Sequence, residues 1–551
     1  MSVRDGPGMA AVVRHHLALT AALALAGAAL AGPAVAESGA TAVDVDARRI
    51  TVALNYEPAQ LDATRSNDSP SINILGHTGE GLTRTDDGEA RPGVAERWEI
   101  RPDGATFHLR HDARWHDGTP VVAQQFVDSW RRLVDPATAS PQATLLRGVA
   151  NAIAITEGTV PPDALGVEAI GDHRLEVRFE RPFITFANRV SAVALHPVRL
   201  DVIEHFGDRY ASTAETMAAN GPFMVTERRP GARVVLQRNP EYWNAERVRL
   251  ETIDFAYITS DTTAHLNLFR DGRIAYVQFD AESVETALAE RWRIHRFDRG
   301  GLGMLMLNLG EDSVMRDPGL REALDLAFDR HEFVNRVLQE AGMLPAQTIY
   351  PRWMRAGDER LRDVIPPGPK PFDSERARRL VDESLERLGI EPPLRLHVLL
   401  PDNSTAARTA EYLQRLWGDR LGIDVRVDRQ IFKQVLAKMY AGEFDVVAGL
   451  SFNVTEPLMI ADFFASWSGH QPMNYRSPAF DDAYRRAEHA ATVDAWVEAL
   501  GDMQRIVAED RPALVTHETA ELYAVHPQLR GVTRSRGGAN VDFTDAWIEA
   551  R

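Results

Sequence analysis

The sequence predicts an α/β protein of two or three domains, with a mostly parallel sheet that is covered by helices. A chain of 551 residues is too long for a single hydrophobic core. Helical and strand periods alternate through residues 374–450. This alternation is typical of βαβ units, in which a helix links two parallel strands.

Local signals place the elements of the first half. Residues 50–56, ITVALNY, alternate as a strand should. Short strands follow, separated by Asp-Gly turns at 103–104 and 117–118. Thr119 and Pro120 suit the N-cap and the first position of a helix, because a hydroxyl can accept a hydrogen bond from the first turn and proline needs no donor there.

The second half alternates more clearly. An amphipathic helix over 374–388 should stop at Gly389. The segments after it are a strand at 394–400, a helix at 406–417, a strand at 423–427 and a strand at 444–450. The last strand runs into AGLSFNVTEP, residues 448–457. Ligands of open α/β sheets gather at the carboxyl ends of strands, so this junction is the first place to expect one.

Composition excludes several classes of function. The formal net charge is −17 at pH 7, and such a surface repels nucleic acid. There is no cysteine, which excludes disulfides, thiolate metal sites and cysteine nucleophiles. After the N-terminus, no segment has the ~18 consecutive apolar residues of a membrane span.

The N-terminus has the pattern of a secretory signal peptide. Basic residues precede the apolar run 17–31, and Ala34-Val35-Ala36 supplies the small residues of a cleavage site. We therefore expect residues 1–36 to be removed after Ala36 and the mature chain to be periplasmic. A lipoprotein needs a cysteine at this point, so the chain is not expected to be one. Either Met1 or Met9 can be the start.

The sequence contains no convincing motif for catalysis, for a metal or for a cofactor. The glycine-rich GGLGMLMLNLG reads as a strand rather than a nucleotide loop. His116-Asp117 reads as a turn rather than part of a catalytic set. His517, Glu518 and Glu521 could ligate a metal, but the favoured interpretation is a solvated surface segment. No catalytic residue, metal or cofactor is predicted, and the chain is not expected to be an enzyme.

Several stretches together resemble one protein family. They are GVAERWEI, FHLRHDARWHDGTPVVAQQFVDSWRRLVDPATASP, NGPFMV, VLQRNPEYWN, FRDGRI, REALDLAFDR and NYRSPAFDD. In this order, over roughly residues 50–530, the sequence resembles the oligopeptide- and dipeptide-binding proteins. These are periplasmic solute-binding proteins of ABC transporters.

The resemblance implies a two-lobed periplasmic binding protein fold, type II-like, with the extra third domain of peptide binders. Lobe 1 would comprise residues 46–69, 195–298 and 521–551, domain II residues 70–194, and lobe 2 residues 299–520. The crossovers near His196, Gly300 and Thr519 would be hinges on which the lobes close over a ligand.

The resemblance also implies a ligand site. The strand after Phe444-Asp445-Val446 would form a wall of the peptide cleft, on which an extended ligand adds main-chain hydrogen bonds. Asn453 stands where relatives that bind free peptides carry an aspartate for the ligand's α-ammonium. Relative to the oligopeptide branch, one residue is missing near Val447, an arginine is absent there, and Leu450 replaces a tryptophan. These departures put a free-peptide ligand in doubt, although a turn asparagine is an alternative for Asn453.

Other positions are carried over individually. Phe432 keeps an aromatic residue that relatives have, and Glu57 faces the cleft in relatives, although a solvated loop acid is the plain alternative. Asn220-Gly221 is either a simple turn or a place where the backbone approaches a ligand closely. The predicted ligand-binding residues are Glu57, Asn220, Gly221, Phe432, Gly449, Leu450, Ser451 and Asn453.

The expected function is capture of a peptide or peptide-like solute and its delivery to the permease subunits of an ABC importer, by a monomer that binds no nucleic acid. A binder of another solute, such as an oligosaccharide or a modified peptide, is the alternative within the same fold. A periplasmic chaperone and a secreted hydrolase are alternatives from other classes, and the sequence offers no nucleophile with a base for the latter.

Overall fold

The computed structural model describes residues 41–550 except 281, 358, 370, 455, 470 and 536–539. The predicted signal peptide, residues 1–36, lies outside the described residues. Among the helices in the described part, none combines the length and the apolar character that crossing a membrane requires.

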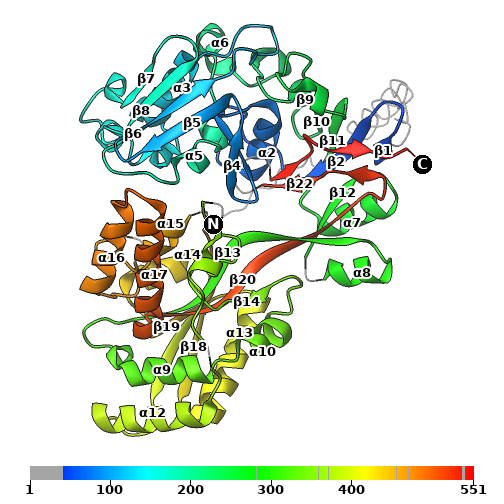
Figure 1. Cartoon of the computed structure of the whole chain (residues 1–551). Coiled ribbons are helices and arrows are strands. Elements are labelled where there is room, and N and C mark those ends of the chain that lie inside the picture. The colour runs from blue at the N-terminus through cyan, green and yellow to red at the C-terminus, as the bar shows by residue number, and fades with distance from the viewer. Residues whose placement is uncertain are drawn as a thin grey trace, which may run out of the picture. The chain divides into compact units, whose positions relative to one another are not determined.

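The largest sheet has seven strands in the order β12-β20-β13-β19-β17-β18, with β14 also paired to β20. Its two longest strands, of 14 and 13 residues, lie side by side in Figure 1. The strands are β12 (Tyr276–Phe279), β13 (Ile294–Leu307), β14 (Leu344–Pro345), β17 (Arg395–Pro401), β18 (Asp424–Gln430), β19 (Val446–Asn453) and β20 (Ala513–Val525).

This sheet is mixed, so the prediction of a mostly parallel sheet is wrong. Only β17 with β18 and β17 with β19 pair in parallel, as the βαβ units at 394–450 require. The pairs of β13 with β19, and of β20 with β12, β13 and β14, are antiparallel. The error arose because β13 and β20 join the sheet from distant parts of the chain, where no local helix reveals the direction of pairing.

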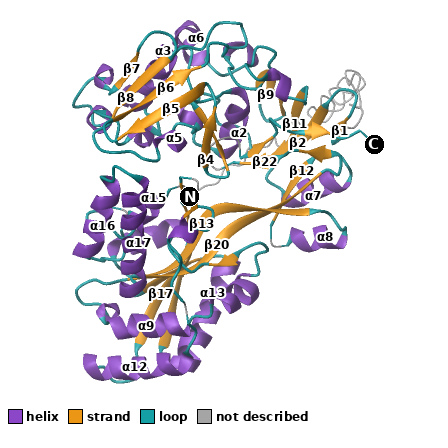
Figure 2. Cartoon of the chain, viewed as in Figure 1, coloured by secondary structure: helices purple, strands orange, loops and turns teal. Residues whose placement is uncertain are grey.

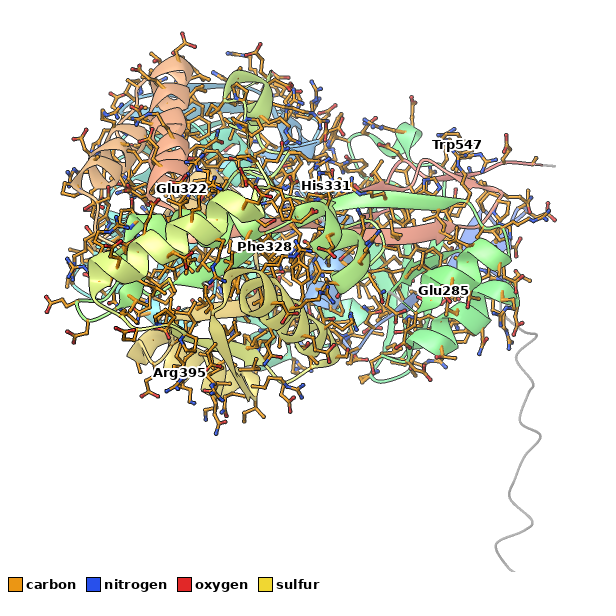
Figure 3. The ribbon with its side chains drawn as sticks, turned by 90° about the horizontal axis from the view of Figure 1, so that it is seen from below. Glu285, Glu322, Phe328, His331, Arg395 and Trp547 are labelled. Carbon is orange, nitrogen blue, oxygen red and sulfur yellow. The ribbon has the colours of Figure 1, made fainter. Side chains whose placement is uncertain are left out.

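Helices cover both faces of the sheet (Figure 2). One face packs on α9 (Pro318–Ala327), the π-helical turn Phe333–Leu338 that follows α10 (Arg330–Glu332), α12 (Ser374–Leu388) and α13 (Ser404–Leu413). Figure 3 views this layer from below and labels Phe328, which is 1% exposed and contacts Phe333 and Tyr412. The other face packs on α11 (Leu361–Val364), α14 (Phe432–Ala441), α15 (Pro457–Ala461), α16 (Pro478–Glu488) and α17 (Val493–Asp510).

Two smaller sheets have cores of their own. The order β1-β2-β11-β10-β9 is antiparallel except for the β2–β11 pair. Its strands are β1 (Val43–Asp44), β2 (Arg49–Leu54), β9 (Phe223–Arg229), β10 (Arg233–Arg238) and β11 (Thr252–Ile258), and they pack with α2 (Ser69–Thr78). The antiparallel order β5-β6-β8-β7 packs on α3 (Ala123–Val134); its strands are β5 (Ala95–Arg101), β6 (Gly104–Leu109), β7 (Val167–Ala169) and β8 (Arg174–Arg178).

Shorter elements complete these regions. They are the hairpin β3 (Thr83–Asp86) and β4 (Glu89–Pro92), and the helices α4 (Ala152–Thr156), α5 (Phe186–Arg189), α6 (Leu200–Phe206), α7 (Thr262–Arg270) and α8 (Ser283–Ala289). The proposed domain boundaries and hinges stay predictions. Both β13 and β20 cross those boundaries within a strand.

Most local signals are confirmed. The helix over 374–388 ends at Gly389, which adopts the left-handed conformation at φ 67°. The glycine-rich segment forms β13, and His116 and Asp117 form a turn in which Thr119 N donates to the Asp117 carboxylate.

The predicted start of α3 is wrong by about one turn. The helix begins at Ala123 rather than behind Thr119 and Pro120, because Pro120 pairs with Arg114 in a β-bridge. The Gln125 side chain takes over the capping role and accepts from the backbone N of Val122 at 3.0 Å.

In the large sheet, the imidazole of His517 occupies the space over Gly303, which has no side chain. Gly303 of β13 pairs with Ser451 of β19 on one side and with His517 of β20 on the other. The imidazole of His517 lies over Gly303, where a Cβ atom would stand 2.1 Å from its Cε1. It reaches the Ser451 hydroxyl, 3.2 Å from its Nε2, and its Nδ1 is 2.9 Å from the Thr516 hydroxyl. Glycine at 303 therefore allows one side chain to link three strands.

The prediction of a solvated segment at His517 and Glu518 is wrong, because both residues are buried on β20, which pairs with strands on both sides. His517 is 7% exposed and Glu518 is 3% exposed. The Glu518 carboxylate accepts from Arg352 N at 3.0 Å and from its Nε at 3.2 Å. Glu521 pairs with Arg534 and with Arg299.

Replacing Gly303 with alanine should lower the free energy of unfolding by ~1–3 kcal/mol, because the new methyl group overlaps the buried ring of His517. Denaturant unfolding measures this loss. The same substitution in a His517→Ala background is the control, since the ring is then gone. Equal losses in both backgrounds would contradict the packing described for Gly303.

Acid should destabilise the protein through its buried histidines. Burial lowers the pKa of His196 and of His517 to about 4. The unfolded chain binds these protons below pH ~6.5 and the folded chain does not until pH ~4, so stability falls as the pH falls through this window and is unaffected above it. At pH 5 each histidine should contribute a loss of ~2 kcal/mol relative to pH 7.

Denaturant unfolding at pH 7 and pH 5 checks this expectation. His517→Gln should reduce the difference between the two pH values, whereas His205→Gln, at an exposed histidine, should leave it unchanged. Identical pH dependence in the wild type and in His517→Gln would refute the role of His517.

Candidate ligand site at the carboxyl end of β19

The last six residues of β19 form an open edge. Pairing of β17 with β19 ends at Leu399 opposite Val447, and β17 itself ends at Pro401, which has no N–H to donate. Residues 450–453 pair with β13 on one side, Ala448 and Gly449 lie in a bulge, and among the described residues no strand pairs with the other side of this stretch. Unpaired N–H and C=O groups at a strand edge can accept another extended chain.

A β-bulge marks the start of this edge. Met306 pairs with Val447 and Met304 with Leu450, so two residues of β19 stand opposite one residue of β13. Gly449 lies in the bulge with φ 74°, a left-handed conformation that favours glycine. A Cβ atom there would lie 3.2 Å from Pro401 Cδ. The sequence thus needs glycine here for backbone reasons.

The ladder shows which groups face outward. Val454 N donates to Gly300 O at 3.1 Å, and alternate residues of an antiparallel ladder point their polar groups at the partner. The N–H and C=O groups of Ser451 and Asn453 therefore point to the open edge. Both side chains are exposed, whereas Leu450 is 8% exposed and belongs to the core. Asn453 is the last strand residue rather than a turn asparagine.

A cavity of about 280 Å³ lies beside this edge. Gly449, Leu450 and Ser451 line it from β19, and Thr516 and His517 line it from β20. Ser404 and Thr405 contribute from the start of α13, which is capped by the Asn403 side chain accepting from Ala406 N at 2.8 Å. The structure thus brings three of the predicted site residues together around one cavity.

Two predicted residues lie elsewhere. Phe432 is 59% exposed at the start of α14, beside the exposed Ile431. Glu57 follows β2, where its Oε2 accepts from Gly231 N at 2.8 Å and its Oε1 lies 3.9 Å from Arg228 Nη2. Glu57 is therefore anchored to the β9–β10 turn rather than free in a solvated loop. Ligand contact at both positions stays a prediction.

Asn220 and Gly221 have a visible structural role. The Asn220 amide, 3% exposed, accepts from Glu80 N at 3.0 Å and donates to Glu80 O at 2.9 Å. A Cβ atom on Gly221 would stand 2.7 Å from the carbonyl carbon of Thr78. The close approach that glycine permits is thus to the chain's own backbone. Ligand contact by these two residues stays a prediction.

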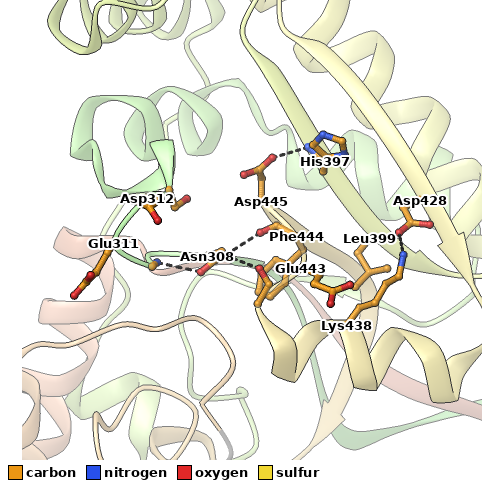
Figure 4. Close-up of a pocket in the computed structure, with 13 residues that line it drawn as sticks. Asn308, Glu311, Asp312, His397, Leu399, Asp428, Lys438, Glu443, Phe444 and Asp445 are labelled. Atoms are coloured by element: carbon orange, nitrogen blue, oxygen red, sulfur yellow. Dashed lines mark hydrogen bonds and ion pairs between the residues drawn. The ribbon is translucent and has the colours of Figure 1, made fainter.

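A larger cavity of about 580 Å³ lies at the opposite end of the strands (Figure 4). It is acidic, with Glu311, Asp312 and Glu443 in its wall. Asp445, directly before β19, accepts from His397 N at 2.7 Å, and burial raises its pKa. Its size does not make it the ligand site, because it borders the amino ends of β17 and β19, away from the open edge.

Two cavity residues, His517 and Glu340, were not predicted to contact a ligand. Neither belongs to a motif, and both are far from β19 in the sequence. Glycine at position 303, between two apolar flanks, is the one local sign that a large side chain crosses the strand. Among the described residues, no group of three or more His, Asp or Glu side chains is placed to hold a metal ion.

This chain is similar to known solute-binding proteins. The family model for "Bacterial extracellular solute-binding proteins, family 5 Middle" matches residues 89–472, more than half of the chain. The periplasmic oligopeptide-binding protein OppA of Salmonella typhimurium is 31% identical over 472 residues, which are 81% of this chain and 84% of OppA. The periplasmic murein peptide-binding protein MppA of Escherichia coli is 28% identical over 538 residues, 94% of this chain and 96% of MppA.

A solved structure agrees with these relatives. The unliganded open form of MppA, the periplasmic murein tripeptide binding protein, superposes with a TM-score of 0.81 at 26% identity, covering 93% of this chain and 99% of that one. The mixed α/β architecture is thus the two-lobed fold of these binding proteins. The chain belongs to family 5 of the bacterial extracellular solute-binding proteins.

Proposed function

We propose that this protein is the periplasmic solute-binding component of an ABC importer and captures a peptide or peptide-like ligand between two closing lobes. The open edge of β19 carries the proposal. Ser451 and Asn453 direct unpaired backbone groups and exposed polar side chains to one side, and an extended peptide offers complementary groups at the same spacing. The relatives named above are binders of oligopeptides and murein peptides.

The remaining parts of the proposal follow from family membership and from the sequence. Residues 1–36 would be the signal peptide, cleaved after Ala36, and the mature chain would be a periplasmic monomer without a lipid anchor. It would deliver its ligand to permease subunits in the inner membrane and catalyse no reaction. Lobes 46–69 with 195–298 and 521–551, and 299–520, would close on hinges near His196, Gly300 and Thr519.

The charge at the open edge favours a ligand without a free α-ammonium. Asn453 supplies an amide at the position where the resemblance to the peptide-binding family implies a carboxylate. The nearby Glu456 is paired with Arg189, and Glu57 lies near Arg228. Neither acid is therefore free to replace the missing charge. Peptides with a blocked amino terminus, and peptide-like solutes, should be preferred.

A peptide that pairs with β19 should lose affinity in an alternating pattern when its backbone is N-methylated. Only every second N–H faces the partner strand, so methylation of acetylated tetra-alanine should weaken binding at alternate residues. Each lost hydrogen bond should cost ~0.5–1.5 kcal/mol, equivalent to roughly two- to tenfold in affinity. Isothermal titration calorimetry of the four singly methylated peptides measures this. Uniform losses, or none, would exclude strand pairing as the mode of binding.

Asn453→Asp should reverse the preference for the peptide's amino terminus. A carboxylate at this position can form a charge-assisted hydrogen bond with an ammonium, worth ~1.5–3 kcal/mol, or about ten- to a hundredfold in affinity. Calorimetry with matched free and acetylated peptides, on the wild type and the variant, checks it. Asn267→Asp adds the same charge on α7 and is the control. An unchanged ratio of the two affinities in Asn453→Asp would place position 453 outside the site.

A further inference from the structure

Glu340 brings a carboxylate to the cavity beside Gly449. It lies between the π-helical turn Phe333–Leu338 and β14, which pairs with β20 next to His517. Of the described residues that line the cavity, Glu340 alone carries a carboxylate. Its Oε1 accepts from the Thr405 hydroxyl at 3.3 Å, and it forms no ion pair with a described residue. This negative charge therefore has capacity for a cationic partner.

The other polar groups of the cavity are neutral near pH 7. Ser404, Thr405 and Ser451 contribute hydroxyls. Burial lowers the pKa of His517 to about 4, so its imidazole carries no charge near pH 7. The electrostatic character of the cavity near pH 7 is therefore set by Glu340.

A neighbouring arginine does not neutralise the acid. Arg408 of α13 donates through Nε to Val337 O at 2.8 Å, and through Nη2 to Leu338 O at 2.9 Å and to the Thr405 hydroxyl at 3.2 Å. Its hydrogen bonds thus go to the protein's own oxygen atoms, and it fixes the wall of the cavity.

The rest of the wall suits an aliphatic chain. Leu305, Phe333, Leu338 and Met343 line the cavity together with Met304. The volume of about 280 Å³ is just below the ~300–1,000 Å³ of pockets that hold whole small ligands. It therefore fits one side chain of a ligand better than a complete ligand. Gly449, Leu450 and Ser451 line the cavity from β19, so a ligand that lies along this strand passes its mouth.

We propose that this cavity binds a basic side chain of the ligand, an ammonium group on an aliphatic stem, with Glu340 as the partner of the cation. The inference rests on the proposed function, because the ligand must lie along the open edge of β19. Long basic side chains bury their methylene groups against apolar surface while their charged end reaches a polar group. A carboxylate partner makes the resulting hydrogen bond charge-assisted.

Calorimetry with acetylated alanine tetrapeptides tests the proposal. The set carries a single lysine, norleucine or glutamate at each position in turn, and norleucine keeps the aliphatic stem without the charge. At one position, lysine should bind roughly ten- to a hundredfold more tightly than norleucine, and glutamate should bind least. Glu340→Gln should bring lysine and norleucine to within about threefold, because the amide keeps an acceptor for Thr405 and loses the charge.

Two further variants complete the design. Glu386→Gln removes an exposed acid from α12 in the same part of the chain and should retain the full lysine preference. Glu340→Lys should move the preference from lysine to glutamate. Melting temperatures of all variants, measured without peptide, show that each is folded at the temperature of the titration.

The outcomes separate the two proposals. Equal affinities for lysine and norleucine at every position, or a lysine preference that survives Glu340→Gln, would overturn the basic subsite while peptide binding stands. Failure of every peptide to bind the folded wild-type protein would overturn peptide capture itself, and the subsite with it.

Discussion

The antiparallel pairing of β13 with β20 is the constraint on which the large sheet depends. β13 holds β19 on its other edge, and β20 holds β12 and β14, so these strands take their register from this pair. Buried N–H and C=O groups have to be paired, and a slip of one residue would turn every side chain to the opposite face. Ser451 and Asn453 would then point into the apolar core. The position of the open edge of β19 is thus fixed by the pairing of other strands.

The ladder between β13 and β20 is irregular at one point along the two strands. Its register shifts between Asp298 and Leu302, where Gly300 has φ 95°. On one side of this interruption Arg534 and Arg299 pair with Glu521, and on the other side His517 crosses Gly303. Ordered contacts therefore flank a short stretch in which the ladder is irregular. A local change of backbone angles there would leave both flanking registers intact, as a hinge requires.

Two ion pairs link the segment that follows β8 to the segments that follow β19. Arg189 of α5 pairs with Glu456, and Arg181 pairs with Glu488 of α16 at 2.9 Å. The apolar side chains of each region are gathered mainly in separate cores, apart from Ile184, which packs against the core of the large sheet. Partly exposed ion pairs of this kind contribute little stability each. They can re-form in another arrangement more easily than an apolar core can repack.

The sequence allowed much of the fold to be predicted because its signals are local. The run from α12 to β19 follows from hydrophobic period and from Gly389 as a stop. The predictions that were wrong concern features that depend on contacts between distant parts of the chain. The direction of β13 and β20, and the burial of Glu518, arise from pairing between segments about 200 residues apart. The predicted start of α3 was wrong because Pro120 pairs in a β-bridge. This pairing outweighed a favourable capping pattern.

In the candidate site, too, some residues could be predicted from local patterns and others could not. Gly449, Ser451 and Asn453 could be placed because they follow a recognisable strand within a family pattern. Glu340 and His517 could not, since nothing in their neighbourhood identifies them and only folding brings them to β19. A side chain that reaches the cavity from a distant part of the chain is not revealed by local patterns. The candidate residues on a recognisable strand are thus easier to predict than those that folding brings to it from a distance.

The bulge at Gly449 has a consequence for how such strands change in length during evolution. Val447, Leu450 and Val454 all face one core, although 447 and 450 are an odd number of residues apart. The bulge absorbs the extra residue. Deleting one residue there would restore a regular ladder and still leave Ser451 and Asn453 on the exposed side. Insertions and deletions elsewhere in β19 would exchange the two faces, so this strand can vary in length at one point without losing its polar edge.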